Sequence, residues 1–556
     1  MQDNGGHMHP FFSSICQNKK ATGLLFCIIG IGIFVPYLIF LSQKGVNYNI
    51  AWLTSCAGKI MNGARMSDVC FDSNPPLSVL IYTLPALLIK SGLFNDKALI
   101  MDGYTLFCAL LSTAAVWRIF RVSAVMNITE QNLVLIAYLL ANIILTGDGF
   151  GERDHFVVMG LFPLALVQYS LTYGYALPAR TKWAVLIFGA IGLCIKPHYG
   201  LISAALLLHR MTHQKRIWSI IKDIDFIVLS LVTLLYIGTV FLFFPDFIRI
   251  ILPVSFSLYV LQDAQPFMLR FLLTFFLAVA GLRLCFVWRK DISPLCGFFL
   301  LLASLCLIPY LVQHKGWAYH LIPYNIFAFC GGALLLQHWI KREALKLFNS
   351  KNEKKTALCT VIILIFFTYF MGISPTQTPS AKTYLNFPVI AEINRYRANN
   401  PSCRFFMFDI MEEVQITNFY AACSSASRFP SYWFMGGLYN EEKNIRNNAP
   451  HHLSADQLAF YKQELAEFTA EDFKRYRPDI VLIAHIHTQK DEEETFDFPA
   501  YFSSANAGFA KEWQNYRFVK TMNVTRPRFA NMPPPPFPLY TATYDIYERN
   551  TSENIK

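Results

Sequence analysis

Residues 226–244 read FIVLSLVTLLYIGTVFLFF, an apolar run without a charged side chain. Its length matches the roughly 20 residues that an α-helix needs to cross the hydrocarbon core of a bilayer. Two further uncharged runs of similar length lie at Ala21–Leu41 and Thr356–Ile373. These segments predict a protein that crosses a membrane several times.

The composition of the whole chain agrees with this prediction. Of its 556 residues, 54% are hydrophobic and 15% are charged, and the mean hydropathy is +0.35. Soluble proteins are usually about one quarter charged, so the shortage of charge excludes a disordered, fibrous or ordinary cytosolic chain. Shorter apolar runs raise the expected number of crossings to about eleven. They lie near 77–89, 98–117, 133–146, 156–173, 183–195, 199–208, 271–282, 292–312 and 321–337.

The net charge of +11 arises from basic side chains gathered in short loops, chiefly 209–222 and 341–355. Lys and Arg are enriched in the cytoplasmic loops of membrane proteins, so this charge does not indicate nucleic-acid binding. With both loops inside, 42–76 and everything after about 374 are expected outside. The short run 77–89 is then expected to re-enter the membrane rather than span it.

The sequence predicts three regions. Residues 1–20 form a cytoplasmic N-terminus, and 21–373 form a transmembrane domain with acidic outer loops at 42–76 and 147–154. From 374 to 556 the charge content is ordinary, and strand-like runs at Arg404–Phe408 and Ile480–Ala484 alternate with helix-like stretches such as Ala455–Phe468. Such mixing of strand and helix patterns predicts an extracytoplasmic α/β domain.

Four cysteines lie in the segments assigned to the outside. Cys56 and Cys70 are in the first loop, and Cys403 and Cys423 are in the C-terminal domain. An oxidising compartment would allow these two pairs to form disulfides. Most of the other cysteines lie in apolar runs and are interpreted as small buried hydrophobic residues.

The first outer loop carries Asp68, Asp72 and Asn74 and ends in Pro75-Pro76. The double proline predicts an extended approach to the next apolar run. Acidic residues just outside the hydrocarbon are suitably placed for a general base that faces a lipid-linked substrate. The alternative is a solvated loop in which the aspartates form turns.

A second acidic loop reads Gly147-Asp-Gly-Phe-Gly151-Glu152-Arg153-Asp154-His155 and leads straight into an apolar run. So many ionisable residues at a membrane boundary are costly unless they are paired or functional, and the glycines would let a ligand approach the backbone. A helix N-cap with acidic residues in the first turn is the structural alternative.

Two further polar stretches interrupt apolar runs. In 313–320, Lys315 could bind a phosphate as a point charge, whereas Trp317 and Tyr319 could stack on a sugar or belong to the interfacial aromatic belt. Lys196-Pro197-His198 separates two short runs. A break at membrane depth is tolerated where it faces protein or a water-filled cavity, so Lys196 is expected to face a cavity.

Together these motifs resemble those of the GT-C superfamily of membrane glycosyltransferases, in particular a bacterial branch related to the aminoarabinose transferases and the protein O-mannosyltransferases. The stretch from Gly63 through Asp68 to Leu77 is similar to their first-loop pattern of a glycine, an aspartate and a double proline. The segments 151–155, 196–198 and 315–320 resemble motifs of a bacterial subgroup. The resemblance covers roughly residues 20–375.

The resemblance implies a sugar donor linked to polyprenyl phosphate and an acceptor hydroxyl on a glycan, lipid or protein that arrives from the outer face. It implies inversion at the anomeric carbon, with Asp68 as the base and Asp154 or Glu152 as further catalytic candidates. The donor phosphate would be bound by Lys315, Arg153 and Lys196. The remaining substrate-binding candidates are Asp72, Asn74, His155, His198, Trp317, Tyr319 and His320. A divalent metal, held by Glu152 and His155, is the less favoured option.

One departure from the family is the stretch after the first helix, where Asn47 and Asn49 stand in place of an acidic residue. An amide cannot act as a carboxylate base. A transporter or flippase for a lipid-linked sugar and a non-catalytic membrane scaffold therefore stay as alternatives, although the sequence has no internal repeat of the kind that transporters often show. A bacterial inner membrane is the expected location, with the endoplasmic reticulum as the alternative.

Overall fold

The computed structural model describes residues 44–123, 125–215, 220–260, 268–313, 315–348, 356, 359–364, 379–410, 413–485, 496–525 and 541–550. The chain divides into two compact units. We call the unit of residues 102–233 and 266–376, with 1–43, the helical unit, and the unit of residues 44–101, 234–265 and 377–556 the sheet unit. The predicted crossing at 21–41 and most of that at 356–373 lie outside the described residues.

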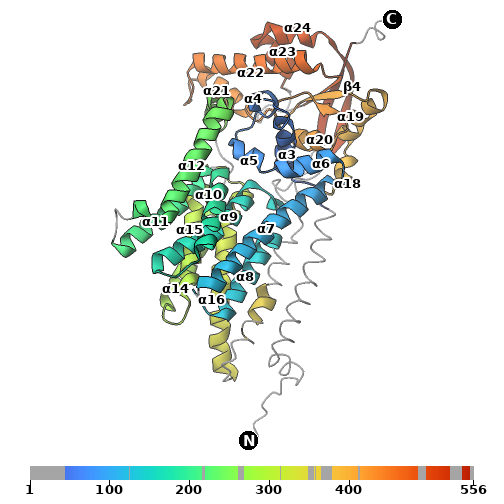
Figure 1. Cartoon of the computed structure of the whole chain (residues 1–556). Helices are drawn as coiled ribbons and strands as arrows, with labels where there is room; N and C mark the ends of the chain where they lie inside the picture. The colour runs from blue at the N-terminus through green and yellow to red at the C-terminus, as the bar shows by residue number, and fades with distance from the viewer. Residues whose placement is uncertain are drawn as a thin grey trace. The chain divides into compact units, whose positions relative to one another are not determined.

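The helical unit consists of long apolar helices joined by short turns (Figure 1). Six of the helices in the described ranges are long and apolar enough to cross a membrane. Of three shorter apolar helices, Phe271–Val287 belongs to this unit, and Pro76–Ser91 and Phe247–Val260 belong to the sheet unit. The predicted total of about eleven crossings therefore stays a prediction. The helices are α7 (Lys97–Ser123), α8 (Ile128–Leu140), α9 (Arg153–Tyr173), α10 (Ala179–Ile195), α11 (Gly200–Gln214), α12 (Ile224–Phe243, to Thr233 in this unit), α14 (Met268–Val287), α15 (Pro294–Gln313) and α16 (Ile322–Phe348).

Helix α9 forms the centre of this unit, and 89% of its most apolar window is buried. It packs closely on α10, because a methyl group added to Gly160 would lie 3.1 Å from the Cα atom of Gly192. Small residues permit such close contact between membrane helices. On another side, Phe162 stacks on Tyr138 of α8 at 4.1 Å between ring centroids and on Phe327 of α16 at 4.9 Å.

The sheet unit contains five strands: β1 (Arg404–Phe408), β2 (Ser424–Ser425), β3 (Ile480–Ala484), β4 (Tyr516–Thr525) and β5 (Thr541–Arg549). Their order is β2-β1-β3-β5-β4, and β1 pairs in parallel with both β2 and β3. The pairs β3–β5 and β5–β4 are antiparallel. The two strands predicted from the sequence are confirmed as β1 and β3, and every residue of β3 is buried.

Helices cover this mixed sheet, with α22, α23 and α24 packed together (Figure 1). An aromatic cluster around Phe408 of β1, which contacts Tyr432 and Phe473, fills the space between sheet and helices. The predicted helix at Ala455–Phe468 is confirmed and continues to Tyr476. The helices are α18 (Ala381–Leu385), α19 (Pro388–Asn399), α20 (Glu413–Tyr420), α21 (Met435–Arg446), α22 (Ala455–Tyr476), α23 (Phe498–Ala505) and α24 (Ala507–Trp513).

The predicted first outer loop is largely helical and belongs to the sheet unit. It contains α3 (Tyr48–Ile60) and the single turn α4 (Met66–Val69). The apolar run 77–89 is divided between α5 (Pro76–Leu80) and α6 (Thr83–Ser91). The same unit also contains helical turns between Phe247 and Val260. The predicted domain boundary at 374 stays a prediction.

Candidate functional site

The first group of candidate residues gathers where α9 begins. Before the helix, Gly147–Gly149 forms a 3₁₀ turn, and Gly151 adopts φ +86°, a left-handed conformation that glycine reaches without strain. Glu152 is the N-cap residue, so Arg153, Asp154 and His155 form the first turn of α9, and all four side chains are buried. The sequence prediction that this acidic loop leads straight into a helix is confirmed.

Asp154 is the centre of a buried hydrogen-bond network. Its Oδ2 atom accepts a hydrogen bond of 2.6 Å from Lys196 Nζ, and its Oδ1 atom accepts one of 2.7 Å from the Tyr199 hydroxyl. Lys196 Nζ also donates to Gln313 Oε1 at 3.1 Å. The Asp154 side chain is fully buried and that of Lys196 is 6% exposed. Removing one member of such a pair leaves an uncompensated buried charge.

The predicted break at Lys196-Pro197-His198 explains how Lys196 reaches this network. Helix α10 ends at Ile195, Lys196 is extended, and a 3₁₀ turn over Pro197–Tyr199 leads into α11. Lys196, which follows α10, and Tyr199, which precedes α11, therefore both reach Asp154. His198 is half-buried and its ring lies 4.9 Å from that of Tyr199.

The segment 315–320 lies beside the same network. Gly316 adopts φ +70°, and Lys315 is buried. Tyr319 presents its ring to two cations, with Arg153 at 5.8 Å and Lys196 at 5.4 Å from the ring centroid, distances at which cation–π attraction operates. The backbone carbonyl of His320 accepts a hydrogen bond of 3.3 Å from Tyr199.

We call this group the buried charge cluster; it comprises Glu152, Arg153, Asp154, His155, Lys196, Tyr199, Gln313, Lys315, Tyr319 and His320. Arg153 Nη2 lies 3.5 Å from Glu152 Oε2, and His155 Nδ1 accepts from the Gly151 amide at 3.1 Å. Arg153 and Lys196 lie beside the carboxylates of Glu152 and Asp154, and Lys315 is buried in the adjoining segment, so the cluster holds cationic side chains in a site shielded from water. Such a site can stabilise an anion strongly.

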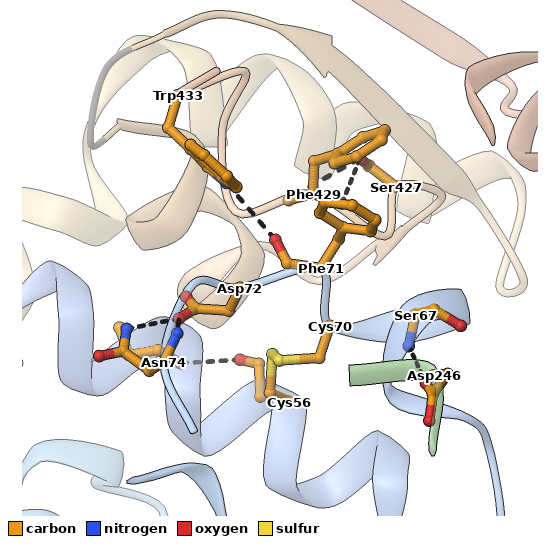
Figure 2. Close-up of a disulfide and its surroundings, with 12 residues drawn as sticks. Cys56, Ser67, Cys70, Phe71, Asp72, Asn74, Asp246, Ser427, Phe429 and Trp433 are labelled. Atoms are coloured by element: carbon orange, nitrogen blue, oxygen red, sulfur yellow. Dashed lines mark hydrogen bonds between the residues drawn. A yellow bond between two sulfur atoms is a disulfide. The ribbon is translucent and has the colours of Figure 1, made fainter. Parts of the chain in front are cut away.

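The second group of candidates lies in the sheet unit around a disulfide between Cys56 and Cys70 (Figure 2). Asp68 lies in α4, two residues before Cys70, and its side chain is 35% exposed. Asp68 Oδ2 is 3.7 Å from Arg475 Nη1, and the preceding amide, of Ser67, donates to Asp246 Oδ2 at 2.6 Å. A second disulfide joins Cys403 to Cys423 elsewhere in the unit.

Asp72 and Asn74 form a turn in front of Pro75-Pro76. Asp72 Oδ1 accepts from the backbone amide of Asn74 at 2.9 Å and from its side-chain amide at 2.5 Å (Figure 2). This arrangement is the Asx turn that the sequence alternative described. In the structure, both residues therefore fix the backbone turn that leads into α5.

Asp472 of α22 forms an ion pair with Arg428, whose backbone carbonyl accepts a hydrogen bond from the Phe71 amide of this loop. Arg428 donates through Nε to Asp472 Oδ1 at 3.0 Å and through its backbone amide to Asp472 Oδ2 at 2.9 Å. Burial raises the pKa of Asp472 to about 6, against the opposing effect of Arg428. Burial also lowers the pKa of Lys59 to about 8, although Asp472 acts in the opposite direction.

The sequence candidates thus divide between the two units. Asp68, Asp72 and Asn74 belong to the sheet unit, and the other catalytic, phosphate-binding and substrate-binding candidates belong to the helical unit. Of these, His198 and Trp317 are half-buried at the edge of their segments. Within the described ranges, no group of three or more His, Cys, Asp or Glu side chains is arranged to hold a metal ion. A metal held by Glu152 and His155 stays an untested alternative.

Comparison with known proteins identifies the fold. No protein-family model and no curated protein matches this sequence. Among solved structures, ArnT from Cupriavidus metallidurans bound to undecaprenyl phosphate is similar over 96% of this chain and 99% of that chain, with a TM-score of 0.50 and 11% identity. The apo state of the same protein is similar over 84% and 93%, with a TM-score of 0.50 and 12% identity. This chain has the fold of ArnT.

ArnT is an aminoarabinose transferase, so the expected likeness in fold to the aminoarabinose transferases is confirmed. Since ArnT is matched over nearly its whole length, the fold extends into both units of this chain. Archaeal oligosaccharyltransferase AglB from Archaeoglobus fulgidus is similar over 86% of this chain and 69% of that chain at 13% identity, with a TM-score of 0.40 that is too low to establish a common fold.

Several residues of the ArnT-like structure escaped sequence reasoning. Tyr199 directly follows the motif that contains Lys196, and Gln313 is the first residue of the stretch that contains Lys315. Their position next to a motif was the one sign in the sequence that they belong to the site. Asp246, Arg428 and Asp472 contact or support the first loop from distant parts of the chain. No pattern within a single sequence connects such positions.

Proposed function

We propose that this protein is a membrane glycosyltransferase that moves a sugar from a polyprenyl-phosphate donor to an acceptor hydroxyl on the outer face of a bacterial inner membrane. The observation that carries the proposal is the buried charge cluster, in which Lys196 is fixed by Asp154 and Gln313 inside a fold shared with ArnT. The ArnT structure that matches over 96% of this chain was solved with undecaprenyl phosphate bound.

The cluster suits the leaving group of such a reaction. As the bond between the anomeric carbon and the phosphate oxygen breaks, the electron pair stays on the polyprenyl phosphate, whose negative charge increases. Lys196, Arg153 and Lys315 supply positive charge that is already desolvated and oriented, and fixed charges of this kind stabilise a developing anion. The Tyr319 ring lies 5.8 Å from Arg153 and 5.4 Å from Lys196, and it attracts both cations.

Asp154 is better suited to orienting Lys196 than to acting as the base. Both of its carboxylate oxygens accept strong hydrogen bonds, from Lys196 and Tyr199. Both oxygens are therefore already occupied by donors and are not available to take a proton from an acceptor hydroxyl. Glu152 is also fully buried and adjacent to Arg153. We therefore assign both acidic residues of the buried charge cluster to the support of its cations.

Asp68 is the candidate that keeps the properties of a general base. Its carboxylate is 35% exposed, and its contacts with Ser67 Oγ at 3.5 Å and Arg475 at 3.7 Å are long. In the proposed step the acceptor oxygen forms a bond to the anomeric carbon from the side opposite the phosphate, and the hydroxyl proton passes to Asp68. The configuration at that carbon is inverted. His155, His198, Trp317 and His320 are proposed to contact the substrates.

The test is release of free polyprenyl phosphate by the purified full chain in detergent, with a panel of polyprenyl-phosphate sugars and membrane extract as the source of acceptor. The wild type is expected to release polyprenyl phosphate from at least one donor, and Asp68→Asn is expected to lower the rate by about 10²–10⁴-fold. Asp96→Asn is the matched control. Asp96 caps α7 through bonds to the amides of Ala98 and Leu99, which an Asn side chain also accepts.

Equal release by the wild type and Asp68→Asn would overturn the assignment of the base. If no donor releases polyprenyl phosphate but a donor raises the thermal stability of the protein, the transporter or scaffold alternative would replace the transferase. Loss of release in Asp154→Asn at unchanged thermal stability would return the role of base to the buried charge cluster.

A further inference from the structure

The segment around Asp68 is fixed at three neighbouring points, all within the sheet unit (Figure 2). Ser67 donates its amide to Asp246, Cys70 is bonded to Cys56 of α3, and Phe71 is fully buried. Asp68 therefore projects from a short segment whose backbone is tied on both sides. A half-exposed carboxylate on such a segment has a defined position although its own contacts are weak.

Phe71 connects this segment to the C-terminal part of the unit. Its amide donates to the backbone carbonyl of Arg428 at 2.8 Å, and its carbonyl accepts from Trp433 Nε1 at 3.4 Å (Figure 2). Its ring contacts Phe429 and Phe468 at 5.2 and 5.7 Å between centroids. Both backbone groups and the side chain of one loop residue thus depend on residues more than 300 positions away in the sequence.

One face of α22 lies behind these contacts. Phe468, Asp472 and Arg475 are spaced i, i+4 and i+7 and therefore share a face of the helix. Phe468 packs on Phe71, Asp472 fixes Arg428 through two hydrogen bonds, and Arg475 faces Asp68. Arg428 also lies over the Phe468 ring at 4.9 Å. We call these three residues of α22 the positioning face.

We propose that the positioning face of α22 holds Asp68 in its reactive position, so that the C-terminal region is part of the catalytic apparatus rather than a separate binding module. The proposal rests on the function proposed above. Phe468, Asp472 and Arg475 are positioning residues, because they act on Asp68 or its loop and touch no reacting atom. A misplacement of about 1 Å in a reacting group can lower a rate by about 10²-fold.

The experiment compares Phe468→Leu and Arg475→Met with two controls on the same helix. Lys474→Met removes an exposed cation next to Arg475, and Phe473→Leu shortens a buried ring that packs on Phe406 and Phe408 of β1. We expect each positioning variant to lower kcat by about tenfold or more while KM for the donor is unchanged, because the phosphate-binding cations belong to the helical unit. The controls should retain the kcat of the wild type per folded molecule.

Each positioning substitution is then combined with Asp68→Asn. If Phe468 and Arg475 act through Asp68, the double variants should be no slower than Asp68→Asn alone, because residues that act as a unit are not additive. A general structural effect would instead lower the residual rate again. Hydrogen exchange of the peptide that contains the Phe71 amide gives a readout independent of activity, and it should accelerate in Phe468→Leu and stay unchanged in Phe473→Leu.

The outcomes separate the two proposals. Transfer by the wild type with unchanged kcat and unchanged exchange in both positioning variants would overturn the role of α22 and leave the transferase intact. Additive losses in the double variants would also overturn it. If the wild type transfers no sugar, the transferase fails and the catalytic role of α22 fails with it, whatever the exchange measurement shows about the loop.

Discussion

Separating Lys196 from Asp154 should destabilise the helical unit and reveal which of the two residues serves the reaction directly. Their charged atoms are 2.6 Å apart, and neither side chain is more than 6% exposed. In Asp154→Asn the ammonium group would keep Gln313 Oε1, at 3.1 Å, as a neutral acceptor. In Lys196→Met the carboxylate would keep the Tyr199 hydroxyl, at 2.7 Å. In either variant one charge stays buried without its counter-ion.

The expected magnitude follows from the burial of the pair. Removing one partner of a buried ion pair costs about 3–5 kcal/mol, whereas replacing both by neutral side chains of similar size is often close to neutral. For a unit of this size, each 1 kcal/mol lowers the melting temperature by about 2–4 °C. Each single variant should therefore melt on the order of 10 °C below the wild type, and Asp154→Asn/Lys196→Met should recover most of that loss.

The assay is thermal unfolding of the full chain in detergent, followed by sugar transfer at a temperature at which all variants are folded. Asp223→Asn is the matched control in the same unit, because Asp223 is 40% exposed and its partner Arg210 keeps a 2.6 Å bond to Asp225. Because Asp223 is exposed and Arg210 keeps its buried partner Asp225, this control should melt close to the wild type. The double variant should stay inactive, because it lacks the cation proposed for the phosphate.

Two results would refute this reasoning. Melting temperatures of Asp154→Asn and Lys196→Met within about 2 °C of the wild type would mean that the pair contributes little to stability. A double variant that is as unstable as the sum of the single variants would mean that the residues act independently. Full transfer activity of the stable double variant would remove Lys196 from the phosphate site.

Three further predictions concern other parts of the chain. Replacing Cys56 and Cys70 by Ser should lower the free energy of unfolding of the sheet unit by about 3 kcal/mol, since the bond closes a loop with a sequence separation of 14; unfolding in denaturant checks this, and an unchanged midpoint would contradict it. Because burial raises the pKa of Asp472 to about 6, the folded chain takes up a proton between pH 7 and 5 that the unfolded chain, with its ordinary carboxyl pKa, does not. The free energy of unfolding of the wild type relative to Asp472→Asn should therefore rise by about 1 kcal/mol as the pH falls through this window, and a difference that does not change with pH would show that the pKa of this carboxyl is not raised. The sulfur atoms of Cys285 and Cys296 are 3.2 Å apart, so mild oxidation should remove two alkylatable thiols in the wild type but not in Cys285→Ala, as mass spectrometry of the alkylated protein would show.

Local patterns were sufficient to predict much of the helical unit. Uncharged runs identified the apolar helices, and the break at Pro197 follows from the missing amide and fixed φ of proline. The ionisable residues before α9 were recognised as costly, and Asp154 does find a buried counter-ion. Which cation pairs with Asp154 depends on how α9 and α10 pack. The sequence pattern contains no information about the distance between the two helices.

The sheet unit was harder to predict, because it assembles from segments far apart in the chain. Strands β1 and β3 were recognisable as apolar runs, and Ala455–Phe468 as a helix. The spacing of Phe468, Asp472 and Arg475 is visible in the sequence, but it is equally consistent with a solvated helix face. The contacts of that face with Phe71, Arg428 and Asp68 are visible only in the structure.

The packing of α9 against α10 has a consequence for how the protein enters its membrane. The two helices follow each other in the chain and pack closely at Gly160 and Gly192, so they form an antiparallel hairpin. Asp154 lies in the first turn of one arm and Lys196 lies directly after the end of the other, which places both charges at the same end of the hairpin. A charged side chain is costly in hydrocarbon when alone, whereas this hairpin carries both partners. If α9 and α10 insert together during synthesis, Asp154 and Lys196 would enter the membrane as a neutral ion pair.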